Sequence, residues 1–170
     1  MYKKFVKRLL DFVLSTLAII VLAIPMLVIA LIIKISDPGP ALFVQMRSGK
    51  NKKSFKMYKF RSMKVNAPHD MPTRMLTDSD QYITRIGKFL RKSSLDELPQ
   101  IFNIWTGKMS IIGPRPVIVD ETDLIEERDK YGANDVRPGL TGWAQINGRD
   151  EIGVHLKAKL DGEYLSLIHI

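Results

Sequence analysis

The sequence predicts an α+β protein, mostly helical, with an N-terminal helix inserted in a membrane and one small domain at the membrane surface. Two observations support this prediction. Residues 12–33 form an apolar run without a charge, and two short β-like runs and several helical patterns follow it. A chain of 170 residues has room for a membrane segment and one domain, but not for two full enzyme domains. We therefore expect a single active site.

The apolar run is long enough to cross a bilayer. As a helix, its 22 residues would extend ~33 Å. No small-residue cleavage site follows at residues 34–38, so the run differs from a secretory signal peptide and is expected to be retained. We predict a membrane-inserted segment over residues 1–36 and a membrane-associated domain over residues 37–170.

Basic residues flank the apolar run on both sides, four of them before it and nine over residues 34–64. Both flanks therefore favour the cytosolic side of a membrane. Pro25 interrupts the run and predicts a kink, and a re-entrant helix broken at Pro25 would keep both flanks on one side. A straight membrane-spanning helix with a tolerated proline is the alternative, which the residue pattern alone favours.

The uneven charge also indicates which partners to expect. The whole chain has 26 basic and 18 acidic residues, but residues 1–64 hold 13 of the basic and only 2 of the acidic ones. Basic clusters beside a membrane segment bind anionic lipid head groups. Membrane lipids are therefore expected partners, and nucleic acid is not, because the rest of the chain is slightly acidic.

Residues 41–46 and 55–63, joined by a polar turn over residues 48–53, predict a β-hairpin with a basic face. Residues 66–80 show no periodicity and predict a loop. Residues 81–92 predict a basic amphipathic helix, either on a membrane surface or against the core of the domain. Further along the chain the patterns predict a core helix over 95–105 that Pro99 kinks or delays, an irregular turn at 113–116, a charged helix over 120–131, a rigid loop at 137–143 and an amphipathic helix from Val154.

The composition limits the chemistry of the site. Cysteine is absent and only three histidines occur, at His69, His155 and His169. A thiolate nucleophile and a zinc–thiolate site are therefore excluded, and a histidine-rich metal site is not expected. Any nucleophile must be an oxygen or a nitrogen, and any metal ion would be held by carboxylate oxygens.

The adjacent acids Asp96 and Glu97 follow Arg91 and Lys92 at a predicted helix start, where backbone N–H groups favour anions. A carboxylate there can attack phosphorus, and its neighbour can hold Mg²⁺. Capping of the helix is the alternative role, and it is the commoner one for an arbitrary pair of acids.

Three further residues in tight loops are candidates for ligand binding. Arg115 lies between two prolines and Arg149 follows Gly148, as in many arginines that clamp phosphates, although most loop arginines are simply solvated. Trp143 could stack on a base, but anchoring by apolar contacts is the commoner role.

Four ordered motifs show a resemblance to a known family over about residues 3–164. The chain resembles the bacterial sugar transferases known as monotopic phosphoglycosyl transferases, or polyprenyl-phosphate sugar-1-phosphate transferases. The motifs are Lys59-Phe60-Arg61-Ser62-Met63, Ser94-Leu95-Asp96-Glu97-Leu98-Pro99-Gln100, Met109-Ser110 with Gly113-Pro114-Arg115-Pro116, and Val136-Arg137-Pro138-Gly139 with Thr141-Gly142-Trp143-Ala144-Gln145 and Asn147-Gly148-Arg149.

The resemblance implies a reaction in two steps. Asp96 would attack the sugar-linked phosphate of a UDP-sugar, release UMP and keep the phosphosugar, which polyprenyl (undecaprenyl) phosphate would then accept. Glu97 would bind Mg²⁺, and Arg91, Arg115 and Arg149 would surround the phosphates.

The resemblance also implies a place in the cell and a pathway. It favours the re-entrant helix broken at Pro25, in the bacterial inner membrane with the active site facing the cytosol. The reaction would be the first membrane step in assembling capsule, exopolysaccharide, O-antigen or glycoprotein glycans. The motifs identify neither the sugar nor the oligomeric state.

Two departures from the family pattern keep other functions open. Ile24 precedes Pro25 where members often have serine, and the C-terminus is expected to be truncated. One alternative is a non-catalytic membrane-associated protein that binds UDP-sugar or polyprenyl phosphate. Another is a nucleotide-sugar hydrolase that uses the same carboxylates.

Overall fold

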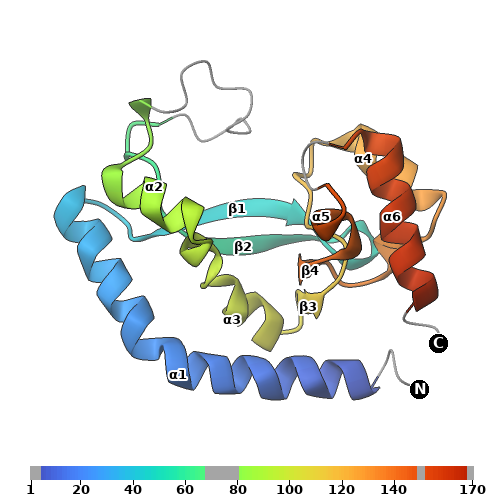
Figure 1. Cartoon of the computed structure of the whole chain (residues 1–170), viewed down its shortest axis with the longest axis horizontal. Helices are drawn as coiled ribbons and strands as arrows, with labels where there is room; N and C mark the ends of the chain where they lie inside the picture. Colours follow the sequence, from blue (N-terminus) through green and yellow to red (C-terminus); the bar gives the residue numbers. More distant parts are fainter. Residues whose placement is uncertain (1–4, 68–80, 149–151, 168–170) are drawn as a thin grey trace. The chain divides into compact units, whose positions relative to one another are not determined.

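The structure, a computed structural model, describes residues 5–67, 81–148 and 152–167. Figure 1 shows that these residues are mostly helical. They also form two small sheets of two strands each. The predicted mixture of many helices and few strands is confirmed. Predictions for residues 68–80 and for Arg149 and His169 lie outside the described residues.

The chain divides into two compact units. Unit 1 contains Met1–Ile19, Gln45–Met57 and Gln100–Ile170, and unit 2 contains Ile20–Val44 and Tyr58–Pro99. Each unit therefore combines part of the apolar helix with part of the polar chain. The predicted domain boundary at residue 36 separates apolar from polar sequence, whereas the two units are defined by compactness. The predicted domain boundary therefore stays a prediction.

Helix α1 (Lys7–Ser36) is 30 residues long, or about 45 Å at 1.5 Å per residue. Its apolar side chains are widely exposed, with Ile24 at 74% and Val21 at 71%, which lipid tolerates and water does not. Among the described residues it is the one helix long and apolar enough to cross a bilayer. Pro25 lies inside α1, which does not end there, so the predicted break and re-entrant path stay predictions.

The predicted hairpin is confirmed by strands β1 (Leu42–Ser48) and β2 (Ser54–Phe60), which form one two-stranded sheet. The turn between them contains the short 3-10 helix η2 (Lys50–Lys52). Strand β2 ends three residues before the predicted end, because Met63 pairs with Ile83 in an isolated antiparallel bridge. The intervening residues Arg61 and Ser62 are buried and turn to other partners.

Unit 2 has an apolar core formed by α1, β2 and helix α2 (Arg85–Lys92). Its buried members are Met26, Ile33, Phe60 and Leu90, and Leu95 and Leu98 pack against them. The predicted helix began at residue 81, but α2 begins after Thr84, whose side chain accepts a hydrogen bond from the backbone N–H of Gly87. This cap, together with the bridge at Ile83, shortens the helix.

After α2 the chain forms the 3-10 helix η5 (Leu95–Glu97) and then helix α3 (Gln100–Trp105). The single core helix predicted over 95–105 is therefore divided at Pro99, which cannot donate the backbone hydrogen bond that a continuous helix needs. The Ser94 side chain, which precedes η5, makes no cap hydrogen bond.

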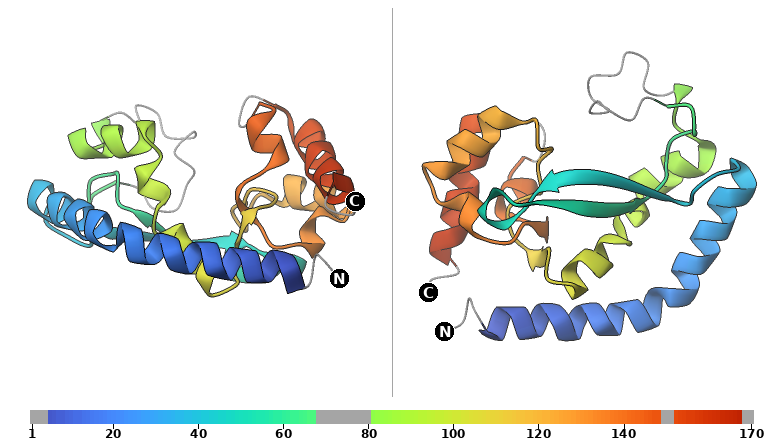
Figure 2. Two further views of the ribbon diagram at one scale, coloured as in Figure 1. Left: turned by 60° about the horizontal axis from the view of Figure 1, so that its bottom comes forward. Right: turned by 180° about the vertical axis from the view of Figure 1, so that it is seen from behind.

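Unit 1 contains a parallel pair of short strands that the sequence did not predict, β3 (Ser110–Ile112) and β4 (Gly139–Thr141). Strand β3 ends just before the segment predicted as an irregular turn, 113–116, and β4 lies within the segment predicted as a rigid loop, 137–143. Helices α4 (Thr122–Asp129), α5 (Trp143–Ile146) and α6 (Val154–Leu167) and the 3-10 helix η6 (Ala133–Asp135) complete the unit. Figure 2 shows α6 beside α4, where Ala158 is buried with Leu124.

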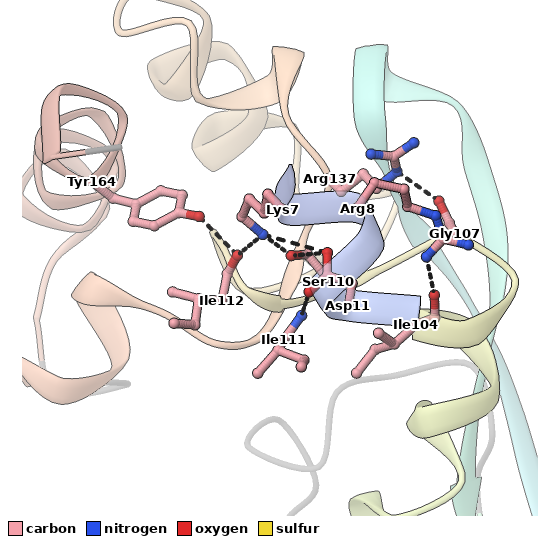
Figure 3. Close-up of polar contacts among 10 residues, drawn as sticks. All are labelled: Lys7, Arg8, Asp11, Ile104, Gly107, Ser110, Ile111, Ile112, Arg137 and Tyr164. Carbon is pink, nitrogen blue, oxygen red and sulfur yellow. Dashed lines mark hydrogen bonds and ion pairs between the residues drawn. The ribbon is translucent and has the colours of Figure 1, made fainter. Parts of the chain in front are cut away.

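Polar contacts fix the first turns of α1 within unit 1 (Figure 3). Buried Asp11 accepts hydrogen bonds from the Ser110 hydroxyl at 2.8 Å and from the backbone N–H of Ile111 at 3.0 Å. Lys7 donates to the Ser110 hydroxyl and to the carbonyl of Ile112. The start of α1 is thus bound to β3 by one basic and one acidic side chain, Lys7 and Asp11.

Arg8 binds the end of α3 in the same unit. Its guanidinium donates to the carbonyls of Ile104 and Trp105, each at 2.7 Å, which are groups that a helix end leaves without helical partners. The Trp105 ring also stacks on Phe12, with ring centroids 6.1 Å apart. Two turns of α1 therefore contact the polar part of the chain directly.

Candidate active site around Asp96

Asp96 lies in η5, where its side chain is almost completely buried and only 8% of the residue is exposed. Two residues before Asp96, Ser94 adopts a left-handed backbone conformation (φ 57°). This residue begins the tight turn. The predicted position at a helix start is correct only in part, because η5 is a single 3-10 turn and α3 begins four residues after Asp96. Asp96 is therefore a buried acid on a short turn, and it does not cap a long helix.

Glu97, the second predicted acid, forms an ion pair with Lys59. The Lys59 ammonium lies 2.8 Å from a Glu97 carboxylate oxygen, and both side chains are largely buried. Lys59 lies near the end of strand β2, so the pair joins the hairpin to η5 inside unit 2. The lysine offsets the charge of the Glu97 carboxylate and fixes its direction.

Arg91 lies in the last turn of α2 and is held by Ser62. The Arg91 Nε–H donates to the Ser62 hydroxyl at 2.8 Å, and Ser62 is itself buried. One N–H of the guanidinium is thereby fixed by the protein. A guanidinium oriented in this way is suited to binding phosphate oxygens.

The pKa of Asp96 is raised above its ordinary value, first of all because burial removes water from the carboxylate. Repulsion from Glu97 raises it further. Lys59, Arg91 and the backbone N–H of Asp96 itself act in the opposite direction. Burial therefore outweighs the two neighbouring cations and disfavours the ionised form of this carboxylate.

Gly87 explains how α2 comes so close to the segment that carries Ser62. A Cβ atom at Gly87 would lie 1.9 Å from the Ser62 carbonyl oxygen. Only glycine avoids this steric clash. The same carbonyl accepts a hydrogen bond from the backbone N–H of Thr84 at 3.1 Å. Close backbone contact at the start of α2 therefore sets the position of Arg91 at its end.

Two further residues, Arg115 and Arg149, were predicted to bind phosphates. Arg115 belongs to unit 1, where its carbonyl accepts a hydrogen bond from Arg128 at 3.0 Å and Arg128 forms a buried ion pair with Asp161. Arg149 lies outside the described residues. The structure thus brings together Arg91, Asp96 and Glu97.

Trp143 was predicted either to stack on a base or to serve as an anchor. Its indole N–H donates to Glu163 of α6 at 3.2 Å, and the residue is half-buried. This contact supports the anchoring role, because the indole is bound to the domain itself.

The carboxylates fit Mg²⁺ but not a metal site formed by the protein alone. No group of three or more metal-binding side chains occurs in the described ranges. Asp96 and Glu97 offer two adjacent carboxylates, and Mg²⁺ is commonly held by one or two carboxylates together with phosphate oxygens of a substrate. The donor set therefore fits a metal ion that is bound along with a phosphate ligand.

Sequence reasoning assigned no role to Lys59 or Ser62, although both belong to a motif that it singled out. Their partners are 38 and 29 residues away, and no periodicity connects positions so far apart. The one available signal was the motif itself, which places a lysine and a serine at the end of a predicted strand.

An apolar helix of membrane-crossing length, followed by a buried carboxylate that interacts with two cations, is expected of a membrane-associated enzyme that acts on phosphates. The sequence matches the bacterial sugar transferase family over residues 2–170. The chain belongs to this family, which confirms the resemblance seen in its motifs.

Three relatives illustrate the range of the family. A UDP-glucose:undecaprenyl-phosphate glucose-1-phosphate transferase of Xanthomonas campestris pv. campestris is 46% identical over 84% of the chain and 30% of its own length. A UDP-N-acetylgalactosamine-undecaprenyl-phosphate N-acetylgalactosaminephosphotransferase of Aeromonas hydrophila is 43% identical over 84% and 34%. An undecaprenyl-phosphate galactose phosphotransferase of Salmonella typhimurium is 34% identical over 95% and 37%. The chain therefore spans about a third of the length of these relatives.

Proposed function

We propose that the protein is a phosphoglycosyl transferase, which moves a sugar-1-phosphate from a UDP-sugar to undecaprenyl phosphate and releases UMP. The observation that supports this best is the buried Asp96 with its raised pKa, which interacts electrostatically with Lys59, Arg91 and Glu97. The names of the relatives agree in the acceptor and differ in the sugar. The donor is therefore assigned only as a UDP-sugar.

In the first step a carboxylate oxygen of Asp96 forms a bond to the sugar-linked phosphorus. The bond from that phosphorus to the bridging oxygen breaks, and UMP leaves with the electron pair. In the second step an oxygen of undecaprenyl phosphate attacks the same phosphorus, and Asp96 leaves as a carboxylate. Burial of Asp96 suits this role, because a poorly solvated carboxylate is a better nucleophile than a hydrated one.

The surrounding residues would stabilise the charge of the phosphates. Arg91, held by Ser62, would donate to phosphate oxygens, and Lys59 would offset the charge of both acids. Glu97 would hold Mg²⁺, which when bound neutralises charge on the diphosphate. Arg115 and Arg149 are proposed as further phosphate ligands on the strength of their motifs.

We also propose that α1 is re-entrant and turns back near Pro25. Arg8 binds carbonyls of α3, and at the other end Asp37 pairs with Arg61 after β2. Both partners belong to the polar chain after α1, in which the described residues contain no second helix that could cross a bilayer. Both ends of α1 then lie on one side, and the basic flanks favour the cytosolic face of the bacterial inner membrane.

The proposal is tested by measuring UMP release from a panel of UDP-sugars by the purified protein with Mg²⁺, with and without undecaprenyl phosphate. We expect many turnovers with one donor and only when the lipid is present. Asp96→Asn should lower the rate by roughly 10³-fold or more. Many turnovers without lipid would indicate a hydrolase, and donor binding without any release would indicate a binding protein.

A further inference from the structure

Arg61 is a buried cation that the proposed reaction does not use. Only 6% of the residue is exposed, and it directly follows strand β2, between Lys59 and Ser62. Its guanidinium forms an ion pair with the Asp37 carboxylate at 3.2 Å and donates to the Asp37 carbonyl. Its backbone N–H donates to the carbonyl of Ala41 at 2.8 Å. Main chain and side chain of Arg61 therefore bind the same short turn.

The turn over residues 37–41 is fitted to this arginine. Gly39 has a φ of 151°, and a Cβ atom there would lie 2.8 Å from the Arg61 guanidinium. Pro38 and Pro40 on either side restrict the backbone further. A turn that is rigid and leaves space for one guanidinium holds that group in one place.

Asp37 is itself fixed on two sides. Its backbone N–H donates to the carbonyl of Ile33 in the last turn of α1, at 3.0 Å. Its carboxylate accepts a hydrogen bond from the backbone N–H of Val65 at 3.2 Å. The ion pair thus joins the end of the apolar helix to the chain on both sides of Arg61.

Stability alone does not explain a buried ion pair. The desolvation of two charges offsets most of their attraction, and apolar replacement of both partners is often neutral for folding. The neighbours of Arg61 suggest another reason, since Lys59 pairs with Glu97 and Ser62 holds Arg91. A shift of Arg61 would move both of these contacts together.

We propose that Arg61, held by Asp37, is a positioning residue that sets the direction of Lys59 and Ser62 and through them of Glu97 and Arg91. The inference rests on the proposed function, because it concerns the same site. It makes the geometry around Asp96 depend on the turn that ends the membrane helix.

The test replaces both partners at once, in the variant Asp37→Leu/Arg61→Met, so that no unpaired charge remains. Displacement of reactive groups by about 1 Å can lower a rate by about 100-fold, and we expect a loss in kcat of this size. The Mg²⁺ concentration for half-maximal rate should rise, and the increase in Tm on adding Mg²⁺ with UDP should shrink. The Tm without ligand and the amount in the membrane fraction should stay near those of the unchanged protein.

Arg61→Lys provides a milder variant. It keeps the charge but loses the fork of donors, and we expect a loss of about tenfold in kcat with the same change in Mg²⁺ dependence. Lys52→Ala is the matched control, because it removes an exposed ion pair of 2.9 Å with Asp129 in unit 1 and should leave every readout unchanged.

The outcomes separate this inference from the proposed function. One outcome is that the parent protein catalyses multiple turnovers while the double variant has the same kcat and Mg²⁺ dependence. In that case the positioning role is wrong and the proposed function stands. If the double variant does not fold, unchanged kinetics in Arg61→Lys would likewise show that the positioning role is wrong. If the parent protein releases no UMP, the proposed function is wrong. The increase in Tm on adding Mg²⁺ with UDP, compared between the parent protein and the double variant, still decides whether Arg61 positions the site.

Discussion

At the scale of single residues, the main feature is that burial and the neighbouring cations shift the pKa of Asp96 in opposite directions. Burial raises its pKa, while Lys59 and Arg91 lower it. A group with a raised pKa in the folded state makes the ionised protein less stable, and this cost is complete above the folded pKa. It disappears as the pH falls below the pKa of the unfolded chain, where both states are protonated.

Asp96→Asn should therefore raise the stability of the protein while it abolishes turnover. Without Mg²⁺ and nucleotide, we expect the Tm of the variant to exceed that of the unchanged protein at pH 8. The difference should become smaller as the pH falls through the folded pKa of Asp96. Thermal unfolding at several pH values measures this, and an equal or lower Tm at pH 8 would contradict it.

Lys59→Met should weaken the site in a pH-dependent way. Lys59 lowers the pKa of Asp96, so its loss should raise that pKa and move the acidic limb of the kcat/KM profile to higher pH. We expect a loss of roughly 10–100-fold in kcat/KM, larger at pH 6 than at pH 8.

The matched control for this variant is Lys56→Met, at an exposed position of the same strand, where the profile should not move. A uniform loss at all pH values in Lys59→Met would show that Lys59 does not act through the ionisation of Asp96.

At the scale of elements, α2 is placed by the close contact of Gly87 with the Ser62 carbonyl. Gly87→Ala should push α2 away from the Ser62 carbonyl and weaken the hydrogen bond that Arg91 donates to the Ser62 hydroxyl. We expect a loss of about 1–3 kcal/mol in the free energy of unfolding and a lower kcat in the protein that remains folded. Chemical denaturation and UMP release measure the two effects.

Gly153→Ala is a suitable control, because a Cβ atom there meets nothing within 4 Å. It should leave both quantities close to those of the unchanged protein. Equal effects of the two substitutions would contradict the role given to the contact at Gly87.

The elements also show what the sequence can predict. The apolar helix, the basic hairpin and the helix from Val154 follow from local pattern and are present. The division at Pro99 was foreseen as a kink or a later start. The parallel pairing of β3 with β4 was not foreseen, because three-residue strands 29 residues apart leave no periodic signal.

In the candidate site, too, local groups could be predicted from the sequence and long-range contacts could not. Arg91, Asp96 and Glu97 are close in sequence, and their charges and the turn residues near them identify them as a group. Their partners Ser62 and Lys59 lie on a different element, as do Arg61 and Asp37, and only the folded chain brings them together. Local pattern thus identifies the candidate reactive groups, and tertiary structure identifies the residues that contact them.

At the scale of the whole molecule, the re-entrant path of α1 makes a direct prediction about topology. The chain contains no cysteine, so single cysteines can be introduced at the exposed positions Phe5 and Ser36. We expect both to be protected from a membrane-impermeant maleimide in intact spheroplasts and to react after lysis. Reaction of only one of them in intact spheroplasts would show that α1 crosses the membrane.

The most direct test of the central claim, that Asp96 carries the phosphosugar, is mass spectrometry of the protein after incubation with its UDP-sugar and Mg²⁺ but no lipid. We expect one phosphosugar per chain on the peptide that contains Asp96, matched by one equivalent of UMP and removed by undecaprenyl phosphate. The adduct should be absent in Asp96→Asn. Lipid-dependent turnover with no adduct, or with an adduct that persists in Asp96→Asn, would contradict the account.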